Sequence, residues 1–270
     1  MRTVCLLLLL SIAVTLAGQD SPIQDNSFLV EEAYNQEDGV IQHISFMQRL
    51  SNGDLLFTQT DEWPLRTLKH QLSVTAAMGH SGAYPQSGTS WGDTALNYRY
   101  QLAGNGDARV AVAPRLTLLL PTGNSALGRG FGGWGLQTNI PVSVAHGHRL
   151  VTHWNAGVTW VPSAQNAAHE KAAVVNPNLG QSTVFLAHPR FNVLCEWVWN
   201  LSTTVTGPGR TATSQNLFVN PGVRWAHNLK SGLQIVPGLG VPIGVGPSAG
   251  QKGMVFYLSF EHGFRGAKSR

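Results

Sequence analysis

Long stretches of this chain alternate between apolar and polar side chains with a period of two. Within 94–102, for example, Leu96, Tyr98 and Leu102 share one face, and Asn97 and Arg99 share the other. Such alternation predicts a β-strand whose two faces meet different surroundings. The alternating runs exceed the roughly 5–6 residues of an ordinary strand and match the roughly 9–11 residues of a tilted strand that crosses a membrane. The pattern therefore favours membrane-spanning β-strands.

The spacing of these runs predicts twelve strands joined by connections of alternating length. The strands are expected to begin near residues 40, 54, 68, 93, 108, 134, 149, 181, 191, 216, 233 and 253. Short turns follow the even-numbered strands, at 104–107, 146–149, 188–190 and 228–232. Long connections rich in Gly, Ser, Pro and Asn follow the odd-numbered strands, at 80–91, 121–133, 162–180 and 202–215. The first hairpin departs from this rule, since its tight Ser51-Asn52-Gly53 turn lies on the long-loop side.

This asymmetry is typical of outer-membrane barrels with an even number of strands. We therefore expect an all-β fold: a transmembrane antiparallel up-and-down β-barrel of about twelve strands, with both termini in the periplasm. A secreted β-sandwich or a soluble barrel would also alternate, but strand length and the segregation of loops favour the membrane barrel.

Composition excludes several other classes of protein. Hydrophobic residues make up 43% of the chain, which is enough to build a core and excludes intrinsic disorder. Past the N-terminus, no run approaches the roughly 20 apolar residues that a membrane-spanning helix needs. The net charge of +4 comes from scattered basic residues, which argues against nucleic acid as a partner.

The chain divides into four expected segments. Residues 1–17 are expected to be a cleaved signal peptide, with Arg2 before an apolar run and Thr15-Leu16-Ala17 at the cleavage site. An acidic segment follows at 18–38, then the outer-membrane barrel at 39–264 and a basic tail at 265–270. The expected location is the cell outer membrane, where the partners are lipid and the barrel-insertion machinery, and the expected state is a monomer.

The acidic segment leaves two interpretations open. Its acidic residues include Glu31, Glu32 and Glu37, and Asp25-Asn26-Ser27 is suited to cap a short helix. The favoured interpretation is a periplasmic tail that holds this helix. The alternative is a plug that enters a basic lumen.

Charged residues on the predicted strands indicate the inner face of the barrel. A midplane arginine on the lipid face costs about 2–4 kcal/mol, so alternation directs such residues inward. One interpretation is a mainly cationic pore wall that selects solutes by charge; the other is an Arg–Glu network that rigidifies a narrow barrel. The candidate pore-lining residues are Arg99, Arg109, Arg115, Glu196, Arg224 and Glu261.

The sequence predicts no catalytic, metal or cofactor site. His146 and His148 flank a glycine in a turn, which is a poor pair of metal ligands without further donors. His43 and Ser45 share one face of the first strand, but a hydrolase also needs an orienting group and an oxyanion site, and the sequence places neither. Gly238 and Gly240 are interpreted as easing barrel curvature.

Several stretches of the chain resemble one known family. They include FLVEEAYNQEDGVIQHI at 28–44, FTQTDEWPLRTLKHQLS at 57–73, GDTALNYRYQL at 92–102, NPGVRWA at 220–226 and LQIVPGLGVPIG at 233–244. Together they are similar to the outer-membrane transporters named for the MetA-pathway of phenol degradation, over about residues 26–264. The resemblance implies an outer-membrane β-barrel and the passage of aromatic or other small organic molecules.

The expected function is therefore passive or facilitated passage of small organic solutes, and not catalysis. The competing class is a structural or interaction barrel with a closed lumen and loop-mediated contacts. An outer-membrane hydrolase is a third class, for which Ser45 would be the nucleophile.

Overall fold

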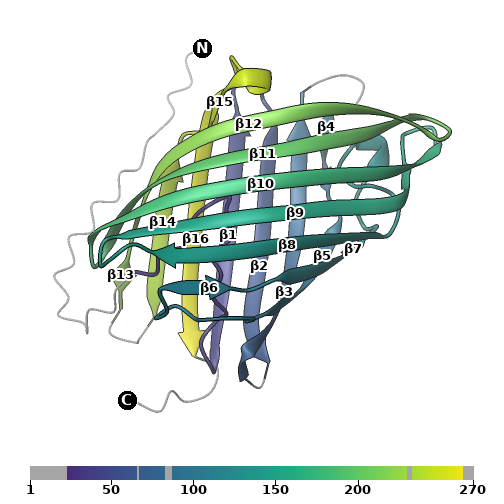
Figure 1. The fold of residues 1–270 in the computed structure, drawn as a ribbon. Coiled ribbons are helices and arrows are strands. Elements are labelled where there is room, and N and C mark those ends of the chain that lie inside the picture. The colour runs from purple at the N-terminus through teal and green to yellow at the C-terminus, as the bar shows by residue number, and fades with distance from the viewer. Residues whose placement is uncertain (1–22, 66, 83–86, 230–232, 264–270) are drawn as a thin grey trace.

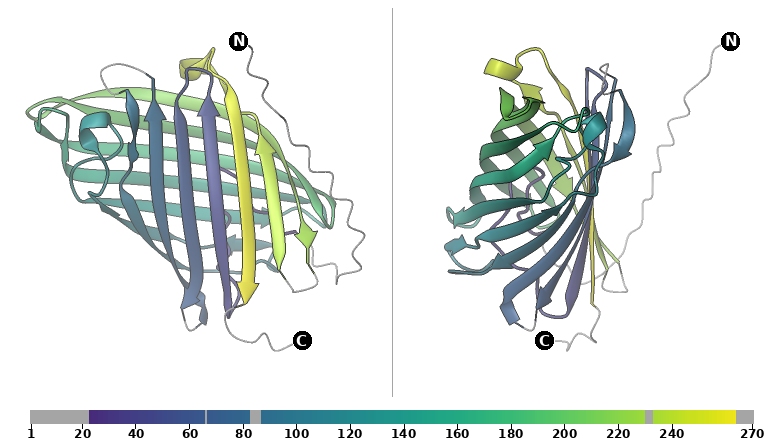
Figure 2. Two further views of the ribbon diagram at one scale, coloured as in Figure 1. Left: turned by 180° about the vertical axis from the view of Figure 1, so that it is seen from behind. Right: turned by 90° about the vertical axis from the view of Figure 1, so that its right-hand side faces the viewer.

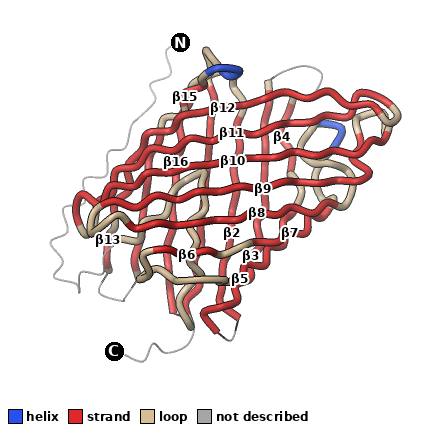
Figure 3. Tube along the Cα trace, viewed as in Figure 1, coloured by secondary structure: helices blue, strands red, loops and turns tan. Residues whose placement is uncertain are grey.

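The computed structural model describes residues 23–65, 67–82, 87–229 and 233–263. The signal peptide expected at 1–17 and the basic tail expected at 265–270 lie outside the described residues. The described part is mostly strand, with two short helical turns (Figure 3). No helix in this part of the chain is long and apolar enough to cross a membrane.

The strands are numbered in chain order. The first eight are β1 Val40–Leu50, β2 Leu55–Leu65, β3 Thr67–Ser81, β4 Gly88–Trp91, β5 Thr94–Tyr100, β6 Val110–Val112, β7 Arg115–Leu120 and β8 Gly135–Ala145. The others are β9 Leu150–Gln165, β10 Lys171–His188, β11 Phe191–Gly207, β12 Arg210–Trp225, β13 His227–Asn228, β14 Gln234–Gly240, β15 Ile243–Gly244 and β16 Gly253–Gly263. The helical turns are η1 Ser125–Leu127 and η2 Gly246–Ser248.

Twelve of the described strands form one closed antiparallel ring. Its order is β1, β2, β3, β5, β7, β8, β9, β10, β11, β12, β14 and β16. The ring closes because β16 pairs with β1 along its length, from Val40↔Gly263 to Leu50↔Gly253. In the left view of Figure 2 these two strands, yellow and purple, lie side by side, and Figure 1 shows β8–β12 crossing the opposite wall. The twelve-stranded barrel predicted from the sequence is confirmed.

The wall carries polar side chains inside and apolar side chains outside. Glu196 and Asn220 are 0% exposed and Arg224 is 1% exposed, whereas Trp134 and Ile140 are 59% and 52% exposed. A soluble protein buries its apolar surface. The reversed arrangement fits a wall with lipid on the outside and a polar lumen inside.

Two of the long connections predicted from the sequence are mostly strand. β10 begins at Lys171 and β12 at Arg210, so the expected loops at 162–180 and 202–215 are wrong. The pairing of β10 with β11 begins at Asn178, while β10 already pairs with β9 from Lys171 onward. Pro177 has no N–H to donate at this point, and the Asn176 side chain accepts the Thr203 N–H at 2.8 Å.

The hairpins β9–β10 and β11–β12 therefore extend beyond the closed ring. They do so at the end of the barrel opposite to Val40 and Gly263. We call this the loop end, and the end that holds Val40 and Gly263 the terminus end. The tight first hairpin is confirmed, with Gly53 at a φ of 93° in the turn between β1 and β2.

Candidate functional site in the barrel lumen

Residues 23–36 lie inside the barrel, and Glu37 and Asp38 are exposed where the chain leaves it. We call residues 23–38 the lumen segment. Val30 is 3% exposed and Ala33 is fully buried, although neither belongs to a strand. The short helix predicted after Asp25-Asn26-Ser27 is not formed, because residues 23–38 contain no helix. The favoured position as a periplasmic tail is also wrong, since the contacts of the segment are with inward-facing wall residues.

One wall carboxylate holds the middle of the lumen segment. Oε1 of Glu196, on β11, accepts the backbone N–H groups of Phe28 at 3.0 Å, Leu29 at 2.7 Å and Val30 at 3.0 Å. Its other oxygen accepts Nδ2 of Asn220 at 2.8 Å. Three consecutive N–H groups that converge on one oxygen form a nest for an anion. Because both oxygens only accept, the arrangement suits the ionised carboxylate.

Four more wall side chains accept N–H groups farther along the lumen segment. Their distances range from 2.6 to 3.0 Å, and the acceptors are Asn155 for Glu31, Ser143 for Ala33, Gln101 for Asn35 and Gln71 for Gln36. In a helix these N–H groups would bond to carbonyls of the segment itself. The wall supplies acceptors instead, and this explains why the segment stays extended.

Two wall arginines hold the carbonyl groups of the lumen segment. Arg224, on β12, donates to the carbonyl oxygen of Asn26 at 2.6 Å and lies 4.8 Å over the ring of Tyr257. Arg99, on β5, donates to the carbonyl oxygens of Glu32 and Tyr34. Both guanidinium groups therefore bind the segment as well as facing the lumen.

Wall glycines make room for the aromatic ring of Phe28. A Cβ built at Gly222 would lie 2.4 Å from Cε2 of Phe28, and one at Gly238 would lie 2.6 Å from Cε1. A Cβ at Gly240 would lie 3.2 Å from the same ring. Gly238 and Gly240, interpreted from the sequence as easing curvature, form part of a notch for Phe28 in the structure; the curvature role stays a prediction.

Acidic side chains neutralise the arginines on the opposite side of the lumen. Nη2 of Arg115 lies 2.7 Å from Oε1 of Glu31. Arg99 lies 3.8 Å from Glu32 and 3.9 Å from Glu62 of the wall strand β2. The sequence analysis did not single out Glu62. A charged residue within the strand β2 is expected to face inward, and this signal could have identified it. The lumen at this level is thus mixed in charge and not mainly cationic.

The remaining predicted site residues lie elsewhere. Glu261, on β16, accepts a hydrogen bond from Nε2 of Gln42 at 2.8 Å on the inner face of the wall. Arg109 is exposed in the connection before β6, so the expected lumen-facing position is wrong for this residue. Glu37 is exposed near the terminus end, away from the buried part of the lumen segment.

Two neighbouring cavities leave space beside the lumen segment. One, of about 390 Å³, lies between residues 26–32 and the wall strands β1, β2, β3, β5 and β7. The other, of about 580 Å³, lies nearer the loop end. Leu56 and Gln137 line both cavities, so the two spaces adjoin. Ile44, Phe46 and Leu56 give the smaller cavity an apolar side that faces the charges of Arg99 and Arg115.

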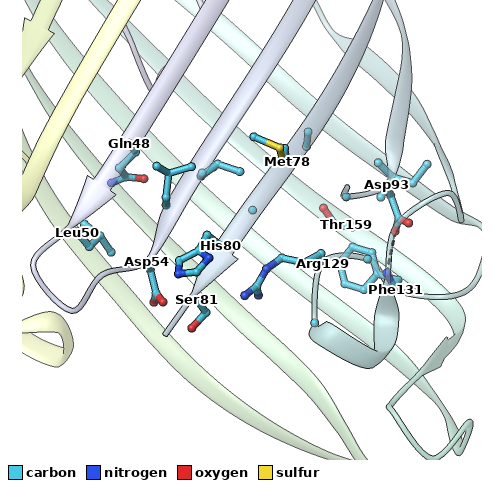
Figure 4. A pocket seen from close by; sticks show the side chains of 18 of the residues that line it. Gln48, Leu50, Asp54, Met78, His80, Ser81, Asp93, Arg129, Phe131 and Thr159 are labelled. Atoms are coloured by element: carbon cyan, nitrogen blue, oxygen red, sulfur yellow. Dashed lines mark hydrogen bonds between the residues drawn. The ribbon is translucent and has the colours of Figure 1, made fainter. Parts of the chain in front are cut away.

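The loop 121–134 narrows the larger cavity. Asp93 accepts the N–H of Gly123 at 2.9 Å and that of Phe131 at 2.8 Å. Burial raises the pKa of Asp93, and these two N–H groups oppose the shift. Figure 4 shows the Arg129 side chain directed from this loop toward the end of β3. Gly79 leaves room for it, because a Cβ there would lie 2.6 Å from Cδ of Arg129.

Among the described residues, no group of three or more His, Cys, Asp or Glu side chains is placed to hold a metal ion. The sequence-based expectation of no metal and no cofactor stays a prediction.

Comparison with known proteins supports the fold. No protein-family model and no curated protein matches the chain. Among solved structures, the chain is similar to an outer-membrane channel from Pseudomonas putida F1, with 14% identity, a TM-score of 0.61, and coverage of 86% of this chain and 98% of that one. It is also similar to the NanC porin, with 8% identity, a TM-score of 0.53, and coverage of 81% and 98%. The chain thus has the fold of an outer-membrane β-barrel.

Proposed function

We propose that the protein is an outer-membrane channel for small organic solutes. The observation that carries this proposal is the pair of adjoining cavities, about 580 and 390 Å³ in size, that lie beside the lumen segment. They run from near the loop end to the level of Arg99 and Arg115. The similarity of the chain in fold to an outer-membrane channel and a porin adds support.

The lining of the smaller cavity suits solutes that are partly apolar. Ile44, Phe46 and Leu56 offer an apolar surface on one side, and Arg99 and Arg115 offer hydrogen-bond donors on the other. An aromatic ring with one polar substituent can contact both sides at once. This agrees with the resemblance to transporters named for phenol degradation, and we propose membership of that family on the motifs quoted above.

We further propose that the lumen segment acts as a partial plug. Its residues 26–31 lie on the side of the lumen next to β9–β12, where Asn155, Ser182, Glu196 and Asn220 lie, and leave a cavity on the side next to β1–β5. Its residues 32–36 reach Arg99 and Gln71 on that second side. The solute path in this proposal runs past the docked segment and does not require its release.

The competing function is a closed structural barrel. The extensive hydrogen bonding of the lumen segment favours it, since Glu196, Arg99 and Arg224 together hold seven backbone groups between Gln24 and Tyr34. In that case the cavities would be dead ends.

A disulfide lock distinguishes these functions. A Cβ at Gly180 would lie 3.0 Å from Cγ2 of Val30, so the pair Val30→Cys and Gly180→Cys is within disulfide reach. The background carries Cys195→Ser, since Cys195 is the free cysteine of the described residues. Planar-bilayer recordings would compare the oxidised lock, the reduced lock and a deletion of residues 25–37.

A channel with a partial plug shows discrete steps in the locked form and larger steps after the deletion. Silence of the folded, unlocked protein would support the closed barrel instead. Steps that vanish on oxidation would contradict the path past the docked segment. Liposome swelling with phenols, organic acids and sugars then ranks the solutes.

A further inference from the structure

A polar cluster interrupts the apolar outer wall on β1 and β2. Gln42 and Phe46 are buried inside the barrel, so the alternating residues His43 and Ser45 face outward. Asp61 is the direct cross-strand partner of His43, and Gln59 is that of Ser45. Polar groups on the lipid face of a barrel are costly, and their presence together calls for a reason.

The two charged members of the cluster form an oriented pair. Nδ1 of His43 lies 2.6 Å from Oδ1 of Asp61, with the side chains 24% and 45% exposed. The imidazole also stacks on Phe260, with ring centroids 4.7 Å apart, and on His262, at 5.1 Å. A carboxylate at Nδ1 fixes the tautomer that leaves Nε2 as the proton acceptor. His43 is therefore held as a general base requires.

Ser45 lies beside this pair, together with an amide group. It is two residues from His43 on the same face of β1, a spacing of about 6.8 Å between Cα atoms. Its Oγ lies 2.6 Å from the amide oxygen of Gln59, and Nε2 of Gln59 donates to Asp61 at 3.2 Å. In this structure the Ser45 hydroxyl contacts Gln59, and a catalytic role requires it to turn toward His43; catalytic contacts of this kind often tighten only with substrate bound.

The cluster lies close to two aromatic residues of the outer wall, Trp63 and Tyr98. Trp63 pairs across the strands with Leu72, and Leu72 pairs with Tyr98. Asp61 is one pleat, about 6.8 Å, from Trp63 along β2. Aromatic rows mark the boundary between lipid headgroups and acyl chains. That boundary is where the ester bonds of a glycerolipid lie.

We propose that Ser45, His43 and Asp61 form an acyl-ester hydrolase site on the lipid-facing wall, with a glycerophospholipid as the class of substrate. Ser45 Oγ attacks the ester carbonyl carbon while His43 Nε2 takes the hydroxyl proton. The bond from carbonyl carbon to glycerol oxygen then breaks, and His43 returns the proton to the leaving alcohol. Water next attacks the acyl-serine, with His43 again as base, and releases the fatty acid.

The supporting residues have distinct roles in this site. Nε2 of Gln59 now donates to Asp61, and its second N–H is the donor that this proposal assigns to the oxyanion. Asp61 is a positioning residue that acts through His43. The site opens toward lipid and not toward the lumen, so this activity is independent of the proposed channel. The orienting group that the sequence alone did not place is Asp61 in this proposal.

The first test labels the folded protein in detergent micelles with a fluorophosphonate probe, which reacts with activated serines. We expect one adduct, located at Ser45 by peptide mass, and none in Ser45→Ala or His43→Gln. Asp61→Asn should slow labelling by about 100-fold or more, and Asp61→Glu should restore at least tenfold of that loss. Ser259→Ala is the matched control, because Ser259 faces the lumen on β16 and is 1% exposed.

The second test measures fatty-acid release from dioleoylphosphatidylcholine in mixed micelles, which should depend on the same residues. The proposal is overturned if Ser45 carries no adduct in the folded barrel, if the adduct forms at another serine, or if the release of fatty acid is absent or persists in Ser45→Ala. Single-channel conductance should be the same for Ser45→Ala and the parent protein. A silent hydrolase site would therefore leave the proposed channel untouched.

Discussion

The carboxylate of Glu196 provides the sharpest test of how the lumen segment is held. Its Oε1 accepts three N–H groups of the segment, from Phe28, Leu29 and Val30, at 2.7–3.0 Å. Glu196→Gln keeps the shape and one acceptor oxygen but removes the charge. The substitution therefore weakens the docking of the segment without opening a cavity in the wall.

The size of the effect follows from the hydrogen bonds. A bond to a charged acceptor contributes about 1.5–3 kcal/mol, against about 0.5–1.5 kcal/mol for a neutral one. Three donors share one oxygen, so we count about 2 kcal/mol for the set and not the full sum. Since 1.4 kcal/mol is about tenfold in an equilibrium constant, the undocked population should rise about 30-fold.

Cysteine labelling measures that population. Val30 is 3% exposed in the docked segment, so a Val30→Cys variant in a Cys195→Ser background reacts with a bulky maleimide only after undocking. When redocking is faster than labelling, the rate is proportional to the undocked population. We expect Glu196→Gln to raise the labelling rate about 30-fold.

A matched control removes the same charge elsewhere. Glu170 accepts Nδ2 of Asn166 in the turn between β9 and β10, at the loop end of the barrel. Glu170→Gln should leave the labelling rate unchanged. Equal rates for the two glutamine variants would refute the role of Glu196 as the anchor of the segment.

Three other substitutions test the surroundings of the lumen segment. Gly238→Ala should displace the Phe28 ring, to which its Cβ would lie as near as 2.6 Å, and so raise single-channel conductance. In a Phe28→Ala background the same substitution should have no effect, and an equal effect with and without Phe28 would contradict the notch. Glu31→Gln frees the Arg115 guanidinium now 2.7 Å away, and reversal potentials in a salt gradient should shift toward anion preference. Asp93→Ala removes the acceptor of two loop N–H groups, so trypsin should cleave the loop 121–134 at least about tenfold faster, whereas an unchanged rate would show that the loop is held by other contacts.

The barrel could be predicted from the sequence because its signal is local. Alternation along a strand, as in Asn97 and Arg99 against Leu96 and Tyr98, reports which wall face meets lipid. Strand starts at Val40, Thr94 and Gly253 follow directly from where that alternation begins. The extension of β10 could not be found in this way, because Asn176, Pro177 and Asn178, residue types that normally indicate loops, lie within the strand. The extension of β12 could not be found because its residues 210–215 are mostly polar and do not alternate.

The position of the lumen segment could not be predicted because its partners are distant in the sequence. Glu196 and Asn155 lie more than a hundred residues from the N–H groups that they accept. From local residues alone, Asp25-Asn26-Ser27 followed by apolar residues predicts a capped helix. The extended conformation is favoured over this helix because the wall offers an acceptor to almost every N–H group that the first turn of a helix would leave unpaired.

Arg99 and Arg115 were predicted to face inward. Their ion-pair partners could not be predicted, because these partners are also distant in the sequence. Arg99 and Arg115 do point into the lumen, where the wall itself places Glu62 beside Arg99. The segment brings Glu31 and Glu32 beside them. Of the two interpretations left open by the sequence, the docked segment therefore gives the charge-paired one at the level of Arg99 and Arg115.

The lumen segment is held mainly by side chains of the wall, so its docking is separate from the stability of the barrel. The backbone groups of β5, β11 and β12 are paired in the strand ladders, so the wall holds the segment through side chains such as Glu196 and Arg224. Release of the segment breaks no ladder hydrogen bond. A variant that undocks it should therefore keep the heat resistance of the folded barrel on unheated gels while its conductance changes, and a barrel that unfolds together with undocking would show that the segment is part of the core.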